Sequence, residues 1–203
     1  MHHDTMKQVL EVFLTLQVTK ELPRQGFINF GFKRNESDSV AAHSFTVCAL
    51  SYFLAKTYAR EGKAVNPEHA LSIALIHDMG EAISGDIGYH VKRVAGKLLA
   101  QVEEKTMDML ISKLDFRADI LSLYHEYNEV TSPEARIVKL ADALDAWTQM
   151  LLTPGADLSS QTVFVDDKAE HLKNDPVFGD ELEDFFRTAC SMLRNKEVTF
   201  LGS

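Results

Sequence analysis

The apolar residues of this chain recur with the period of an α-helix along almost its whole length. No stretch of strict apolar-polar alternation extends beyond a few residues. Apolar residues three and four apart share one face of a helix, whereas alternation marks a strand with one buried face. Asn66-Pro67 and Ser132-Pro133 each put a capping side chain before a proline, as at a helix start. The sequence therefore predicts an all-α helical bundle.

Seven helices are expected, at about residues 5–18, 39–60, 67–78, 92–114, 117–129, 133–152 and 180–194. The first should bury Met6, Val9, Leu10, Phe13, Leu14 and Leu16. The fourth should bury Val94, Leu98, Leu99, Val102, Met109 and Leu110, and the last Leu182, Phe185, Phe186 and Leu193. Two segments rich in Pro, Gly or polar residues are expected to be loops: residues 21–38, and the stretch from Pro154-Gly155 through Asp166 and Asp167.

The length and composition are those of an ordinary globular protein. With 203 residues, 45% hydrophobic and 25% charged, one domain over residues 1–203 is expected. Cys48 and Cys190 lie in apolar helical patterns without paired spacing, which predicts buried free thiols and fits a reducing cytoplasm. Because no apolar run reaches about 18 residues, we expect neither a membrane span nor a secretory signal, and a cytoplasmic location.

The net charge of -9 argues against a nucleic-acid polymer as partner, since such binding relies on a basic surface that releases counterions. A small phosphate compound remains compatible with this charge. Its site would need a metal cation or a few local Arg and Lys residues to make the potential positive at that one place.

Three polar features stand out within apolar helices. His77 and Asp78 are adjacent at the end of one predicted helix, so they can share an ion only near the helix terminus. His43 lies in the apolar run 40–50, and Asp142 lies beside the apolar stripe of its helix. Each alone has an ordinary explanation: a polar helix end, a core histidine bonded to a carbonyl, and a solvated helix face.

Together these features resemble a known family. The order His, His-Asp, Asp is similar to the signature of the HD-domain superfamily, all-α metal-dependent phosphohydrolases. The similarity is strongest to its 5'-deoxynucleotidase branch. It covers about residues 22–152 and is carried by SVAAHS at 39–44, ALIHDMGEAISGDI at 74–87 and VKLADAL at 138–144.

The resemblance implies hydrolysis of phosphomonoesters, with (deoxy)nucleoside 5'-monophosphates as small-molecule substrates, and a homodimer. It implies one divalent metal ion (Co, Mn, Mg, Fe or Ni) at the centre of the bundle, held by His43, His77, Asp78 and Asp142. The implied acid and base candidates are Glu81 and Asp86, and the implied basic residues near the substrate are Arg24 and Lys92. Gln25 stands where the branch often has Trp, and Ala42 where an acidic residue often precedes the first ligand.

The chemistry of these residue types agrees with such roles. Two imidazoles and two carboxylates leave coordination positions open on a divalent ion, so a phosphate oxygen and a water can share it. Glu81 follows His77 by four positions and Asp78 by three. A continued helical turn would therefore hold its carboxylate over the same site as a general acid or base.

Other functions are also compatible with these residues. One alternative is another HD-type nucleotide phosphohydrolase or pyrophosphohydrolase. Guanosine-tetraphosphate hydrolases typically carry HDxxED, however, and here Ala82 follows Glu81. Cyclic-dinucleotide phosphodiesterases need further His ligands, whereas His90 and His125 are expected on the surface. The chain could also be a non-catalytic nucleotide-binding sensor, although such proteins commonly lose ligands, or a purely structural helical module, which the polar residues on apolar helices disfavour.

Overall fold

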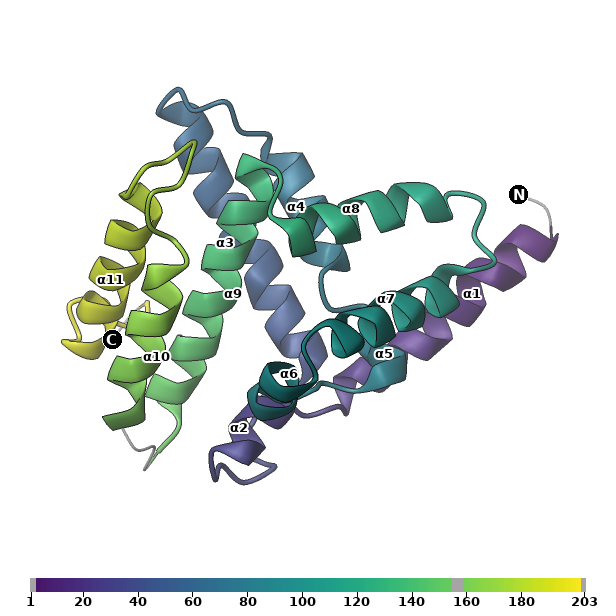
Figure 1. The fold of residues 1–203 in the computed structure, drawn as a ribbon, viewed down its shortest axis with the longest axis horizontal. Helices are drawn as coiled ribbons and strands as arrows, with labels where there is room; N and C mark the ends of the chain where they lie inside the picture. The colour runs from purple at the N-terminus through teal and green to yellow at the C-terminus, as the bar shows by residue number, and fades with distance from the viewer. Residues whose placement is uncertain (1–2, 155–158, 202–203) are drawn as a thin grey trace.

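Residues 3–154 and 159–201 are described by a computed structural model, in which every regular element is a helix (Figure 1). The elements are α1 (His3–Leu16), the 3-10 helix η1 (Gln17–Lys20), α2 (Gln25–Asn29), α3 (Val40–Arg60), α4 (Pro67–Ile76), α5 (Glu81–Ser84), α6 (Tyr89–Ala95), α7 (Lys97–Ile111), α8 (Arg117–Glu129), α9 (Pro133–Leu152), α10 (Ser159–Glu170) and α11 (Glu181–Arg194). The predicted all-α class is confirmed. None of the described helices is both long and apolar enough to cross a membrane.

Helices α3, α4 and α9 form the centre of the molecule, and each begins at a capping side chain. The Ser39 hydroxyl accepts a hydrogen bond from the Ala42 amide, and the Ser132 hydroxyl accepts one from Ala135. Asn66 accepts two amide hydrogen bonds at the start of α4. These side chains satisfy backbone donors that have no partner within the helix, which is why the predicted starts at Pro67 and Pro133 are confirmed.

Three apolar clusters hold the helices together. One joins α3 and α9 to α10 and α11 around the fully buried Trp147 and Phe186. A second lies between α3, α4, α8 and α9, with Val47 and Ile73 among its members. The third joins α4, α7 and α8 around Met107. Both the second and third clusters include a tyrosine that also faces the pocket described below, so the packing of these helices fixes the walls of that pocket.

The predicted loop after Pro154-Gly155 is wrong in its second half, because residues 159–170 form α10. Gly155 itself lies outside the described residues. Ala169 is fully buried against the first cluster and Phe164 is half-buried there. Asp166 on the same helix pairs with Arg187 of α11 at 2.8 Å. The helix is thus stabilised by its neighbours, and its few apolar residues gave no clear periodic signal in the sequence.

The helix predicted at 92–114 is divided at Gly96, whose positive φ of 48° suits a residue without a side chain. Leu99 and Leu110 are buried as expected. The prediction is wrong for four other residues, all exposed: Val94, Leu98, Val102 and Met109. The apolar residues of this segment cover more of the helix circumference than the face that packs against the body. The residues buried on that face include Met107 and Ile111, which were not predicted.

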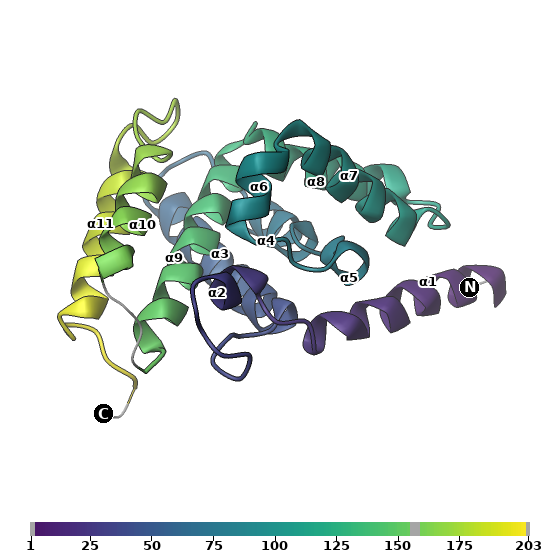
Figure 2. The same cartoon turned by 60° about the horizontal axis from the view of Figure 1, so that its bottom comes forward.

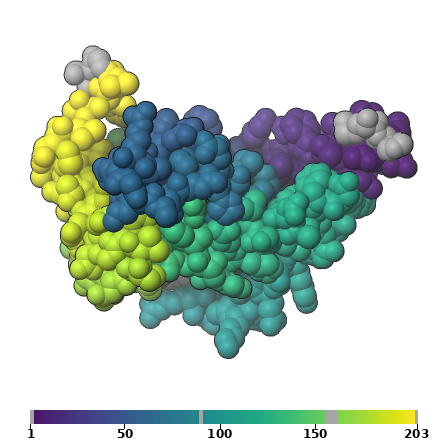
Figure 3. Space-filling view, turned by 90° about the horizontal axis from the view of Figure 1, so that it is seen from above, coloured from purple at the N-terminus to yellow at the C-terminus, as the bar shows by residue number. Residues whose placement is uncertain are grey.

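Helix α1 lies along α5 and α7 at the edge of the molecule and carries the N-terminus at its far end (Figures 1 and 2). Seen from above, it projects from one flank of the body (Figure 3). The predicted burial is wrong, because no residue of α1 is buried. Phe13 is 58% exposed and Leu14 is 70% exposed, while only Val12 and Leu16 pack against the third cluster. An apolar helix face is therefore left uncovered.

The remaining predictions need smaller changes. Residues 21–38 are irregular as expected, apart from the short α2, and α4 ends at Ile76, so His77 and Asp78 follow it. The last helix buries Leu182 and Phe186 fully, and Phe185 and Leu193 in part.

Both cysteines are free, Cys190 buried and Cys48 half-buried. Burial raises the pKa of these thiols to about 12 and about 11, which keeps them protonated at neutral pH.

Candidate active site

His43 is a fully buried imidazole in the first turn of α3 that meets carboxylates on both sides of its ring. Its Nδ1 lies 2.7 Å from Oδ2 of Asp145 on α9. Its Nε2 lies 3.3 Å from Oδ1 of Asp142 and 3.5 Å from Oδ2 of Asp78. Burial alone would lower the pKa of His43, but its hydrogen bonds to Asp142 and Asp145 raise it to about 10. The surroundings of this ring therefore strongly favour a positive charge.

His77 is held in one orientation by the end of α4. Its Nδ1 lies 2.6 Å from the carbonyl oxygen of Ala74, which can only accept a hydrogen bond, so Nδ1 carries the proton. The other ring nitrogen, Nε2, lies 3.4 Å from Nε2 of His43 and 3.1 Å from Oδ2 of Asp78. This tautomer leaves the Nε2 lone pair available toward the same point that His43 faces.

Asp78 and Asp142 complete the group and remain ionised. Burial would raise the pKa of each carboxyl, but the nearby imidazole of His77 holds the pKa of Asp78 below its usual range. A hydrogen bond to His43 does the same for the pKa of Asp142. The hydroxyl of Tyr127 on α8 donates to Oδ2 of Asp142 at 2.9 Å and orients that carboxylate.

The spacing of these four side chains fits one divalent cation. Donors about 2.1 Å from an ion, at tetrahedral or octahedral angles, lie about 3.0 to 3.4 Å apart. The Nε2 and Oδ separations of 3.1 to 3.5 Å lie within this range or 0.1 Å above it. Neutral imidazoles with carboxylates also suit Mn, Fe, Co, Ni and similar ions. By distance, His43, His77 and Asp142 form a group that could hold a metal ion. Oδ2 of Asp78 lies 3.5 Å from Nε2 of His43 and 3.1 Å from Nε2 of His77, so this carboxylate could complete the ligand set.

A second group that could hold a metal, by distance, consists of Asp38, His43 and Asp145. It shares His43 with the first group. An imidazole can bridge two cations only after losing both ring protons, and the Nδ1 contact to Asp145 is that of an N–H donor with its acceptor. We therefore interpret Asp145 as the residue that orients His43, in a carboxylate–imidazole pair behind a single metal position.

A pocket opens over these side chains. It has a volume of about 190 Å³, room for several waters at about 30 Å³ each. It is lined by Arg24, His77, Asp78, Gly80, Glu81, Ser84, Asp86, Lys92, Glu103, Thr106, Tyr124, Tyr127, Asn128, Lys139 and Asp142. His43 lies directly behind this lining. The eight residues singled out in the sequence are thus all brought to one place.

Two side chains of the pocket have buried polar atoms without a hydrogen-bond partner: Nη1 of Arg24 and Oε2 of Glu81. Such atoms are costly unless a ligand or water pairs with them. Burial and the neighbouring carboxylates Asp78 and Asp86 raise the pKa of Glu81 to about 9. Its carboxyl is therefore protonated at neutral pH and can act as a proton donor.

The remaining predicted positions are more exposed. Lys92 lies at the pocket rim with its side chain 47% exposed, and its Nζ pairs with Oε1 of Glu103 at 3.4 Å. His125 is half-buried, with its side chain 42% exposed and Nε2 3.7 Å from Oε1 of Glu104, consistent with a surface role. The side chain of His90 lies outside the described residues.

Among the site residues that were not predicted from the sequence are Tyr127, Lys139 and Asp145. Asp145 follows Asp142 by three positions, so the two share one face of α9, and this spacing was a usable signal. Asp145 also supplies His43 with the carboxylate that Ala42 lacks. Tyr127 lies on α8, whose position over the site depends on tertiary packing and could not be found from local patterns.

The fold and this residue set define an HD domain, and the family model of the HD domain matches residues 16–177. The chain belongs to the HD-domain family. It is 30% identical over 142 residues to the 5'-deoxynucleotidase of Danio rerio, covering 69% of this chain and 66% of that protein. It is 31% identical over 137 residues to the 5'-deoxynucleotidase of Schizosaccharomyces pombe, covering 64% of this chain and 65% of that protein. The chain therefore spans slightly less than two thirds of these relatives.

A solved structure extends the likeness to nearly the whole fold. The crystal structure of a Pyrococcus horikoshii protein superimposes with a TM-score of 0.75 at 30% sequence identity, covering 90% of this chain and 99% of that one. The predicted membership of the HD-domain family is confirmed.

Proposed function

We propose that this protein is a metal-dependent phosphohydrolase that releases phosphate from nucleoside 5'-monophosphates. The observation that carries the proposal is the convergence of two imidazoles and two carboxylates, 3.1 to 3.5 Å apart, on a pocket that also holds a buried, unpaired arginine nitrogen. A metal site beside a free cationic group is the arrangement that a phosphate ester requires.

In this proposal His43, His77, Asp78 and Asp142 hold one divalent ion. When bound, the ion supplies a Lewis acid for the phosphate and lowers the pKa of a water. Asp145 and the Ala74 carbonyl hold the two imidazoles with Nε2 toward the ion, supported by contacts of 2.7 and 2.6 Å. The metal panel in the experiment below determines which ion supports turnover.

The other pocket residues act on the phosphate ester itself. Arg24 binds phosphate oxygens through the guanidinium nitrogen that lacks a partner. Lys92 contributes charge at the rim. As water attacks phosphorus and the bond to the 5'-oxygen breaks, Glu81 donates its proton to the leaving oxygen, while Asp86 is the base candidate that accepts the proton of the water. The raised pKa of Glu81 supports the donor role.

The substrate class rests on the relatives, which are named 5'-deoxynucleotidases. This chain differs from the usual pattern of that branch next to Arg24, where it has Gln25 in place of Trp. The Gln25 side chain donates to Oδ1 of Asn29 at 3.0 Å. We therefore propose nucleoside 5'-monophosphates as the class, with ribose and deoxyribose forms compared directly.

The test is phosphate release from a panel of ribo- and deoxyribonucleoside 5'-monophosphates with Co, Mn, Mg and Ni. His77→Ala should abolish both metal binding and turnover. Glu81→Gln should retain the metal and lower turnover by roughly 100-fold or more. Phosphate release that survives His77→Ala, or an unchanged rate in Glu81→Gln, would contradict the proposed mechanism. Metal binding without turnover of any nucleotide would instead favour a sensor.

We also propose that the protein forms a homodimer through α1. No residue of this helix is buried, and Leu10, Phe13 and Leu14 are more than half exposed. A second copy would cover apolar surface of a kind that monomeric proteins rarely leave open in one patch.

A further inference from the structure

The pocket contains a further cationic side chain, Lys139, which has no role in the proposed mechanism. It lies on α9, three positions before Asp142, and lines the pocket. Its Nζ lies 3.4 Å from the centroid of the Tyr127 ring, and the Tyr127 hydroxyl donates to Asp142. The ammonium group is therefore held against an aromatic face, beside a metal-site carboxylate and open to the pocket.

The charge of Lys139 is not neutralised by an ion pair. No carboxylate oxygen of a described residue lies within 4.0 Å of its Nζ, whereas Lys92 at the rim pairs with Glu103 at 3.4 Å. Burial lowers the pKa of Lys139 to about 8 despite the carboxylates nearby, so the amine remains mostly charged at neutral pH. A charge kept at such a cost in a pocket points to an anionic ligand.

The charges of the pocket show why a third cation is needed. Its lining holds four carboxylates, namely Asp78, Asp86, Glu103 and Asp142, beside the protonated Glu81, against three basic residues, namely Arg24, Lys92 and Lys139. A phosphate dianion entering this pocket meets repulsion from the carboxylates. Lys92 is already paired, so Arg24 and Lys139 are the basic groups best able to offset that repulsion.

We propose that Lys139 binds the phosphate group of the substrate, donating from α9 while Arg24 donates from the start of α2. This assignment rests on the proposed function and extends it, because it names a phosphate-binding residue on the helix that also carries Asp142 and Asp145. Tyr127 serves as the support that keeps the Lys139 ammonium in the pocket when no phosphate is bound.

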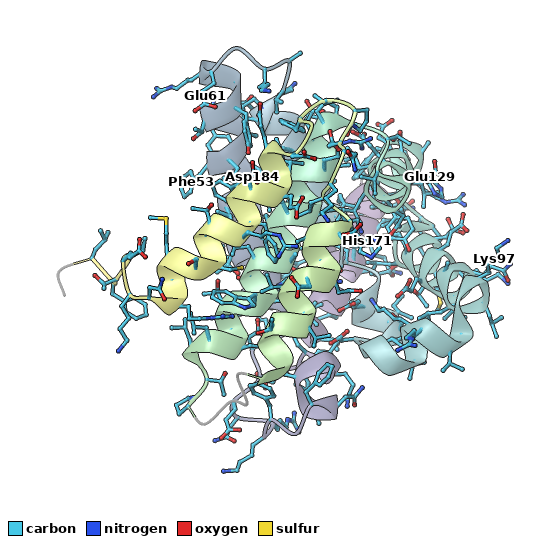
Figure 4. All side chains as sticks on the ribbon, turned by 60° about the vertical axis from the view of Figure 1, so that its left-hand side comes forward. Phe53, Glu61, Lys97, Glu129, His171 and Asp184 are labelled. Carbon is cyan, nitrogen blue, oxygen red and sulfur yellow. The ribbon has the colours of Figure 1, made fainter. Side chains whose placement is uncertain are left out.

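The test separates phosphate binding from metal binding and from turnover. Inorganic phosphate is titrated calorimetrically into the Mn-loaded protein, and Mn affinity is measured in a separate titration. Lys139→Met keeps a flexible chain on the Tyr127 ring without the charge, Lys139→Gln is a second neutral variant, and Lys139→Arg keeps the charge. The matched control is Lys97→Met, since Lys97 extends from the start of α7 at the molecular edge (Figure 4).

The expected result is a roughly 10- to 100-fold loss of phosphate affinity in both neutral variants, the scale of one charge-assisted hydrogen bond. The loss should be smaller in Lys139→Arg and absent in Lys97→Met, and Mn affinity should not weaken in any of them. Unchanged phosphate affinity in the neutral variants would overturn the assignment. A parallel loss of Mn affinity would also overturn it, because Lys139 would then support the metal site.

The same measurements keep this proposal distinct from the proposed function. Phosphate affinity that depends on Lys139, in a protein that hydrolyses no nucleotide, would support the phosphate site while rejecting the hydrolase. Turnover that persists with unaltered KM and unaltered phosphate affinity in Lys139→Met would reject the role of Lys139 and leave the hydrolase intact.

Discussion

At the scale of single residues, the site depends on how each imidazole is oriented from behind. His43 is anchored by Asp145 and His77 by the Ala74 carbonyl, so each ring turns Nε2 toward the same point. Such partners fix the tautomer and strengthen the imidazole as a ligand. A residue that never touches the metal can therefore control its affinity.

Asp145→Asn keeps the shape of this partner and removes its charge. We expect metal affinity to fall by roughly 10- to 100-fold, the usual effect of losing such an orienting group, with little change in folding. Competition with a chelating dye would measure it, and Asp119→Asn on the exposed face of α8 is the control. An unchanged affinity in Asp145→Asn would remove Asp145 from the site.

The buried charge of Lys139 should measurably destabilise the folded protein. Burial lowers the folded-state pKa of Lys139 to about 8 from 10.5, so the folded protein binds fewer protons than the unfolded chain between these values. The cost is therefore fully present below about pH 8 and disappears as the pH rises toward 10.5. By the linkage relation it is at most about 3 kcal/mol.

Lys139→Met should accordingly raise the free energy of unfolding by about 1 to 3 kcal/mol at pH 7, and by much less at pH 10. Urea denaturation at the two pH values measures the difference. A variant that is less stable at pH 7, or whose advantage does not shrink at high pH, would show that the lysine is not strained by burial.

At the scale of elements, α1 differs most from the other helices. Its apolar face contacts the body only through residues such as Val12 and Leu16, and Nζ of Lys113, in the turn after α7, lies 2.7 Å from Oε2 of Glu11. A surface ion pair of this kind contributes little, about 0 to 1 kcal/mol. The helix is long enough to form, yet it needs a further partner to bury its outer face.

Replacing Leu10 and Leu14 by Gln should therefore weaken self-association by at least about tenfold while leaving the fold of the body intact. Both side chains are exposed in the single chain, so their loss removes no internal packing. Sedimentation velocity would follow the change, with Val163→Gln on the exposed side of α10 as the control. A wild-type protein that is monomeric at high concentration would contradict the proposed dimer.

At the scale of the whole molecule, the proposed metal position joins separate parts of the chain. His43 comes from α3, His77 and Asp78 follow α4, and Asp142 belongs to α9. These three helices form the centre of the fold, so an ion bound there links elements that are distant in sequence. A ligand that binds only the folded state stabilises it by mass action.

Chelation should therefore destabilise the protein. With the metal at about 100 times its dissociation constant, the loss is about 2.7 kcal/mol, a fall in Tm of about 5 to 10 °C for a chain of this size. Thermal melts with and without a chelator test this. His77→Ala should show no such difference, and an equal shift in that variant would place the effect elsewhere.

Local patterns in the sequence were enough to predict much of this protein. Helical periodicity and the caps at Asn66 and Ser132 located the central helices, because these signals act within a few residues of the chain. The order of His43, His77-Asp78 and Asp142 identified the family and predicted the group that converges at the pocket.

The tertiary structure decided what depends on neighbours distant along the chain. It formed α10 from a weakly periodic segment because α9 and α11 cover its apolar side, and it left α1 uncovered because nothing in the described chain packs over its outer face. It also brought Tyr127, Lys139 and Asp145 to the group formed by His43, His77, Asp78 and Asp142. Burial and electrostatic contact are set by distance in space, and no local pattern encodes that distance.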